Sequence, residues 1–340
     1  SSRRKALAPT YNPSDPYPKK LAALTYLFED IPDNFDQPWP GRASAPDNIL
    51  VELIEEDPEI PRYVYHSPHY EFICDAPLKP HLVKRFATLF EATREYCRQI
   101  PIATKKAHIA GTKYRNRILL YESVATYVAN GGPPSSAGVY MPGKDIIMVP
   151  LTSLGVKKIG SSYSIDYRED NKTLPHELTH QLTDHFYYEQ GSMGWFSEGL
   201  AEYIAVTPYR SGSFNVKLAV NSIRAYATEY GRKDQGGRAL GTEISAPPLS
   251  QYMLQDYRSF VANANFNYGL GLLITTYFFH MDGDGDRKAI TAFLKTLRDG
   301  KKGEEALSAL RQNRTFDELA KDITKGWRSK GVRIQFAPEK

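Results

Sequence analysis

The spacing of hydrophobic residues changes near Asn171. Before this residue, apolar side chains gather in short runs, many of them rich in β-branched and aromatic residues, as is typical of strands. After it, they recur every three or four residues over longer stretches, as in helices that pack by one face. The pattern predicts a mixed β-sheet followed by a mainly helical half, an α+β fold.

The individual elements follow from the same pattern. In the first half we expect a strand pair that contains Val64, Tyr65, Tyr70, Phe72 and Ile73, followed by a helix at Pro80–Gln99. Three further strands are expected at Ile118–Tyr121, Val139–Met141 and Asp145–Val149. In the second half we expect helices at Thr173–Tyr188, Trp195–Val206, Val216–Tyr230, Gln251–Ala262, Tyr268–Met281, Arg287–Leu297 and Phe316–Ser329. Residues 1–62 are rich in Pro, Asp and Asn and predict an extended arm with one helix near Leu21–Glu29. We therefore divide the chain into this arm, a sheet subdomain at 63–170 and a helical subdomain at 171–340.

Composition excludes some classes of function. At 340 residues and 41% hydrophobic, the chain can bury a large core. Its net charge of +4 is too small and too dispersed to indicate nucleic-acid binding. The longest apolar stretch, Tyr268 to Met281, is too short to span a membrane.

The chain begins Ser1-Ser2 without Met, as a processed or truncated chain would. Its two cysteines, Cys74 and Cys97, could pair, but their positions do not imply it. Few cysteines together with many Tyr, Asn, Ser and Pro residues fit a bacterial exported protein, so we expect a secreted or periplasmic location.

The most informative motif is His176-Glu177-Leu178-Thr179-His180. Residues four apart on a helix share a face, so His176 and His180 can reach one metal ion. Glu177 projects about 100° further round, where it can touch a water molecule bound to that metal. Two imidazoles and an open position suit Zn²⁺, and Glu177 would act as the general base.

The alternative is an ordinary amphipathic helix with two surface histidines. Against it, Leu174, Leu178, Leu182 and Phe186 recur at intervals of four and predict a buried stripe. Asn171 or Thr173 can cap the start of such a helix.

A second acidic pair lies downstream, at Glu198 and Glu202 in the run Gly194-Trp195-Phe196-Ser197-Glu198-Gly199-Leu200-Ala201-Glu202-Tyr203. The two glutamates share a helix face, and small residues beside them favour close packing around a site. Two solvent-exposed glutamates remain the alternative.

Taken together, these motifs resemble those of the gluzincin metallopeptidases, which include the thermolysin-like and aminopeptidase N-like enzymes. The resemblance rests on His176, Glu177 and His180 followed by Trp195–Ala201, which is similar to the Trp-Leu-Asn-Glu-Gly-Phe-Ala run of the aminopeptidases. It implies a zincin-like fold with an active-site cleft between the two subdomains, and one Zn²⁺ ion. It also implies that Glu198 is the third ligand, and that Glu202 orients a histidine ligand. Seventeen residues lie between His180 and Glu198, one fewer than is usual in the aminopeptidases, which we attribute to a loop difference.

The same family places a catalytic tyrosine at the start of a later helix, and Phe266-Asn267-Tyr268-Gly269 lies at a similar distance here. By that resemblance Tyr268 would donate a hydrogen bond to the developing oxyanion. The alternative is a packing role, since the chain has 23 tyrosines.

One departure from the family concerns the substrate. Aminopeptidases hold the free amino group of their substrate with the glutamate of a Gly-x-Met-Glu-Asn strand. The corresponding stretch here, Ala137–Gly143, has no glutamate. Gly138, Val139 and Tyr140 can still form an edge strand that pairs with an extended peptide. We therefore expect cleavage of internal bonds in a peptide or protein substrate.

Two other hypotheses stay open. The chain could be a zinc protein that keeps the peptidase fold without catalysis and binds a partner in its cleft. It could also hydrolyse a bond other than a peptide bond.

Two further features do not indicate metal sites. The run Asp282–Asp286 begins like a calcium loop but has Arg287 where the loop needs glycine, and the remaining histidines lack paired helical spacing with the motif.

Overall fold

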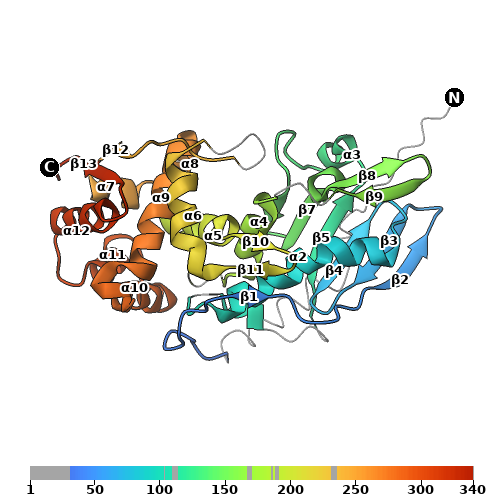
Figure 1. The fold of residues 1–340 in the computed structure, drawn as a ribbon, viewed down its shortest axis with the longest axis horizontal. Helices are drawn as coiled ribbons and strands as arrows, with labels where there is room; N and C mark the ends of the chain where they lie inside the picture. The colour runs from blue at the N-terminus through green and yellow to red at the C-terminus, as the bar shows by residue number, and fades with distance from the viewer. Residues whose placement is uncertain are drawn as a thin grey trace.

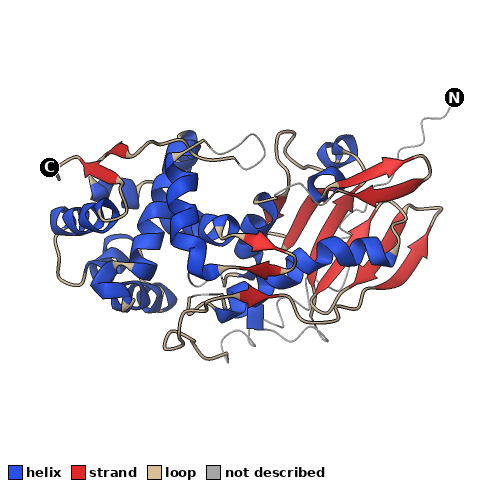
Figure 2. Cartoon of the chain, viewed as in Figure 1, coloured by secondary structure: helices blue, strands red, loops and turns tan. Residues whose placement is uncertain are grey.

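The computed structural model describes residues 31–102, 104–108, 114–166, 171–184, 187, 191–230 and 236–339. It has an α+β fold, in which a mixed sheet lies beside a half made mostly of helices (Figure 1, Figure 2). The helix expected near Leu21–Glu29 lies outside the described residues. Within the described part of the chain, no helix is long and apolar enough to cross a membrane.

The sheet has six strands. In spatial order they are β2 (Glu52–Asp57), β3 (Arg62–His66), β4 (Tyr70–Cys74), β5 (Asn116–Tyr121), β7 (Ile146–Pro150) and β6 (Val139–Met141). The three central strands β4, β5 and β7 are parallel, whereas both edges are antiparallel. β6 is thus an edge strand, and it pairs with β7 through Val139–Met148, Tyr140–Ile147 and Met141–Ile146.

Alternating side chains of the sheet enter two separate cores. One face packs with Tyr127 of α3 (Val124–Ala129) in a small cluster that includes Leu119 and Met148. The other face joins the main core, together with α2 (Pro80–Gln99) and α4 (Thr173–Leu182). Because α4 packs against β6 and β7, the edge of the sheet lies directly over the helix that carries the histidine motif.

Residues 31–57 connect the two halves. β1 (Ala43–Ser44) pairs with β11 (Ser213–Phe214), which in turn pairs with β10 (Tyr209–Arg210). Trp39 contacts the rings of Tyr203 and Phe279 in the helical half. β2 then joins the sheet, so the sheet includes residues that the sequence pattern assigned to the arm.

The helical half consists of α5 (Gly194–Val206), α6 (Ala219–Thr228), α7 (Leu249–Leu254), α8 (Tyr257–Ala262), α9 (Ala264–His280), α10 (Lys288–Arg298), α11 (Gly303–Arg311) and α12 (Phe316–Arg328). The closest pair is α5 and α9, which meet at two glycines. A Cβ on Gly199 would lie 2.2 Å from Thr275 Oγ1, and one on Gly271 would lie 2.9 Å from the Trp195 carbonyl oxygen. Small residues at these two positions therefore let the helix of Glu198 lie against the helix of Tyr268.

Several expected boundaries were wrong. α4 ends at Leu182, because Thr183 is extended and bonds back to the Thr179 carbonyl through both its N–H and its hydroxyl. The expected helix at Gln251–Ala262 is two helices, since Asp256 caps a new start by accepting from the Ser259 N–H. α11 was not anticipated. Nor were the hairpin of β8 (Val156–Ile159) and β9 (Ser162–Ile165), or the parallel pair of β12 (Glu243–Ala246) and β13 (Arg333–Phe336).

Two minor expectations are resolved. Cys74 and Cys97 are both buried and free. The segment at Asp282 is a short 3-10 helix (Asp282–Gly285) between α9 and α10, and the buried carboxylate of Asp282 accepts hydrogen bonds from Tyr277 and Arg314.

Candidate metal centre

The α4 helix brings its two histidines together. Leu174, Leu178 and Leu182 are all fully buried, as the stripe predicted, and they fix which face of α4 is turned into the core. His176 and His180, one turn apart, leave the helix on one side, and their Nε2 atoms lie 3.1 Å from each other. Both nitrogens can therefore reach the same metal ion.

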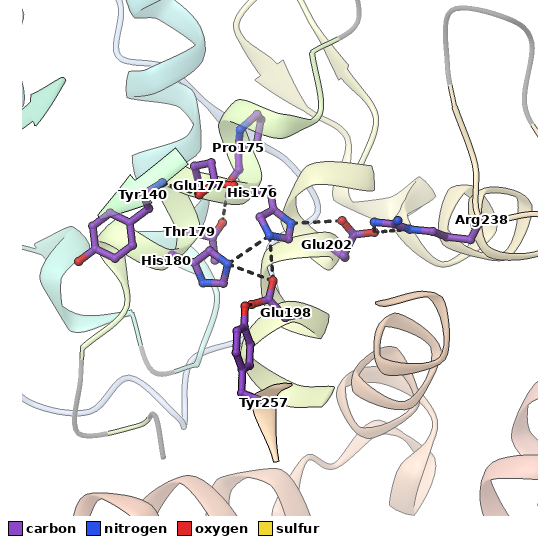
Figure 3. Close-up of polar contacts among 10 residues, drawn as sticks. All are labelled: Tyr140, Pro175, His176, Glu177, Thr179, His180, Glu198, Glu202, Arg238 and Tyr257. Atoms are coloured by element: carbon purple, nitrogen blue, oxygen red, sulfur yellow. Dashed lines mark hydrogen bonds and ion pairs between the residues drawn. The ribbon is translucent and has the colours of Figure 1, made fainter. Parts of the chain in front are cut away.

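Glu198 completes the group from the neighbouring helix α5. Its Oε2 atom lies 3.0 Å from His176 Nε2 and 3.2 Å from His180 Nε2 (Figure 3). Candidate ligand atoms of these three residues all lie within 4.8 Å of one another, so the group could hold a metal ion. Two imidazole nitrogens and one carboxylate oxygen are ligand types that occur at zinc sites in proteins.

The charges in the group favour a cation at its centre. Burial disfavours protonation of His176, but hydrogen bonds to Glu198 and Glu202 outweigh it and raise the pKa of His176 to about 10. Burial also opposes ionisation of Glu198. The charge of His180 and the hydrogen bonds from both histidines nevertheless hold the pKa of Glu198 well below its usual value. A buried carboxylate kept ionised between two imidazoles is a suitable environment for a metal cation, which would replace a proton there.

Glu202 contacts the second ring nitrogen of His176, Nδ1. Its Oε1 lies 3.2 Å from His176 Nδ1, so it can hold the imidazole with Nε2 directed at Glu198. Arg238 pairs with the other oxygen of Glu202 at 2.8 Å. Burial alone would raise the pKa of Glu202, but the His176 hydrogen bond and the Arg238 charge lower it. Such outer contacts fix the orientation of a metal-binding histidine.

Glu177 lies beside this group, on the side of the sheet. Its Oε2 accepts a hydrogen bond from the Tyr140 backbone N–H at 2.7 Å, which holds the carboxylate between β6 and the histidines (Figure 3). Of the expected substrate-binding residues, Val139 packs into the small core cluster and Gly138 donates its N–H to Ser136 Oγ at 3.1 Å. The edge strand thus contacts the candidate base directly.

Two tyrosines lie close to the group, Tyr257 against Glu198 and Tyr268 against His176. The Tyr268 ring stacks on the His176 ring, with centroids 6.0 Å apart, and burial followed by the charge of Glu198 raises the pKa of Tyr268 far above its usual value. Tyr257 donates its hydroxyl to Glu198 Oε1 at 2.9 Å. The sequence indicated only Tyr268.

Arg238 and Tyr257 were both missed from the sequence. The signal for Tyr257 is Asp256, a capping residue that starts α8 there, although it does not reveal that the tyrosine reaches Glu198. Arg238 lies in a loop far along the chain from Glu202, and no local pattern connects the two residues. The Arg238 guanidinium lies 5.2 Å from the centre of the Tyr268 ring, so Arg238 contacts both Glu202 and Tyr268.

A large cavity is lined in part by residues of α4 and α5, the helices that carry the candidate ligands. It has a volume of about 1270 Å³ and is bordered by α2, the start of α4, the end of α5 and α6. None of the three candidate ligands lines it. Its lining residues include Pro175, which precedes His176, and Tyr226, whose ring contacts Arg238.

No family model matches the chain, and no curated protein matches it either. The functional proposal therefore depends on the motif and on the geometry of its side chains.

Proposed function

We propose that this protein is a zinc-dependent metallopeptidase of the gluzincin type, which cleaves internal peptide bonds of a peptide or protein substrate. The observation that carries the proposal is the convergence of His176, His180 and Glu198, from two separate helices, with Glu177 beside them. A surface helix with two incidental histidines would not place a buried carboxylate in contact with both of their Nε2 atoms.

The proposed mechanism assigns one task to each residue. His176, His180 and Glu198 would hold the zinc ion, which supplies a Lewis acid that lowers the pKa of water to about 7. Glu177 takes a proton from the attacking water and returns it to the leaving amine. Tyr268 donates a hydrogen bond to the carbonyl oxygen as negative charge develops there. Glu202, fixed by Arg238, keeps His176 in the required orientation.

The lack of an acidic side chain on β6 favours endopeptidase action. No acidic side chain lies at Gly138–Met141, so nothing on this strand would hold the amino terminus of a substrate. We propose that the substrate occupies a zincin-like cleft between β6 and the helical half. The composition of the chain supports a secreted or periplasmic site of action.

The deciding experiment is a digest of a peptide library by the zinc-loaded protein, with the metal content measured in the same samples. We expect cleavage at internal bonds of both free and N-acetylated peptides, loss of cleavage with a chelator and recovery on addition of zinc. Bound zinc without cleavage of any peptide would instead indicate a silent binding protein. Cleavage that survives complete removal of the metal would contradict the proposed chemistry.

The two tyrosines can be separated by matched substitutions. Tyr268→Phe should lower kcat by about 10²–10³-fold with unchanged metal content, since it removes an oxyanion donor. Tyr257→Phe should weaken zinc binding by roughly tenfold, since it removes a hydrogen bond to a ligand, and should change kcat of the loaded enzyme much less. Steady-state kinetics and zinc competition titrations measure both effects. The reverse pattern would assign the oxyanion role to Tyr257.

A further inference from the structure

The edge strand β6 has few backbone donors left for an incoming peptide. In an antiparallel pair, alternate residues direct their N–H and C=O groups toward the partner strand and away from it. The Tyr140 N–H faces away from β7, because it donates to Glu177. Of the residues two positions away, Gly138 donates to Ser136 and Pro142 has no N–H. The one donor in this stretch that faces the site is thus already bound to the candidate base.

The side chain of Tyr140 is anchored as well. Its hydroxyl donates to Asp145 Oδ1 at 2.9 Å, and Lys106 donates to the same oxygen. Tyr114 donates to Asp145 Oδ2 at 2.5 Å. Asp145 is only 2% exposed, and its φ of +51° is unusual for a residue other than glycine. We call Lys106, Tyr114, Tyr140 and Asp145 the Asp145 network.

Asp145 is also attached to the metal-binding helix. Gln181, which follows His180 and is fully buried, donates to the Asp145 carbonyl oxygen at 3.2 Å. Through its side chain Asp145 thus holds β6, and through its carbonyl it holds α4. Both sides of the contact between Tyr140 and Glu177 are therefore positioned relative to one buried residue.

We propose that Tyr140 is a positioning residue for Glu177, held in place by the Asp145 network. This inference rests on the proposed role of Glu177 as general base. A three-residue edge strand has one neighbour only, and its backbone would otherwise be free to move away from α4. Asp145 also forms an ion pair with Lys106, so the hydrogen bond that its carboxylate accepts from the Tyr140 hydroxyl is charge-assisted. It thereby keeps the Tyr140 N–H directed at the Glu177 carboxylate.

The test compares two substitutions, each of which removes one tyrosine hydroxyl that donates a hydrogen bond to the Asp145 carboxylate. Tyr140→Phe removes the hydroxyl on β6, and Tyr114→Phe, the control, removes the one outside this strand. Phenylalanine fills the same volume, so both variants should fold. Backbone amide exchange at position 140 should become roughly tenfold faster in Tyr140→Phe, the size expected for loss of one supporting hydrogen bond. It should become faster by a smaller factor in Tyr114→Phe, which acts on β6 only through Asp145, and Glu177→Ala would set the upper limit.

Catalysis supplies the second measurement. Tyr140→Phe should lower kcat by roughly tenfold with KM and zinc content unchanged, because only the placement of the base is affected. Unchanged exchange in Tyr140→Phe, or equal acceleration in both variants, would overturn the proposal. If the native protein cleaves nothing, the proposed function fails, while the exchange measurement still decides whether Tyr140 is held in this way.

Discussion

Replacing Glu177 with Gln should lower kcat by about 10³-fold, within the 10²–10⁴-fold range of general acid–base catalysis. The amide keeps the shape of the side chain but cannot accept a proton from water. Glu177 is not among the three residues whose ligand atoms converge, so the variant should still bind one equivalent of zinc. Kinetics on a cleaved library peptide and metal analysis of the same preparation measure the two quantities.

The matched control is Glu305→Gln, which makes the same change at an exposed position of α11. It should leave both activity and metal content unchanged. If Glu177→Gln lost the metal together with activity, Glu177 would be part of the metal site, and its role as proton acceptor would be wrong. Activity at the native level would exclude it from the chemistry.

Replacing Glu198 with Gln should reduce zinc affinity by more than about 100-fold, beyond what loss of an outer-shell partner costs. The carboxylate contacts both histidines and is only 4% exposed, so its charge acts in a weakly screened environment. A neutral amide removes that charge and is a poor ligand for zinc. Activity at limiting zinc should disappear with the metal.

Glu202→Gln is the comparison, because it changes a glutamate one turn further along the same helix. It should cost only about 10–100-fold in affinity, since it disturbs the orientation of His176 and not a ligand. Competition titration against a chelator of known affinity gives both values. Equal losses in the two variants would mean that Glu198 is not a direct ligand.

Much of the site could be predicted because its signals are local. The spacing of His176 and His180 already places both imidazoles on one helix face, and the leucine stripe shows which face of that helix is buried. The small residues after Glu198 indicated close packing, and the structure explains it by the approach of α5 to α9 at Gly199. Each of these inferences depends only on helical period or on residue size within one segment.

The parts that were missed depend on contacts between distant segments. Arg238 reaches Glu202, Tyr257 reaches Glu198, and Gln181 of α4 reaches the Asp145 carbonyl, in each case across more than 30 residues of sequence. No hydrophobic period encodes such a contact. Helix ends were also misplaced where a side chain competes for the backbone, as Thr183 and Asp256 do.

The sequence by itself determined the α+β order of the chain, the helix that carries the histidine motif and the chemical types of the candidate ligands, because these follow from the periodicity and composition of single segments. Only the tertiary structure decided that Glu198 lies between the two histidines, that Tyr257 joins Tyr268 beside it, and that the edge strand holds Glu177 through the Tyr140 amide. These contacts depend on how helices and strands pack, which is fixed by the whole core and not by any one segment.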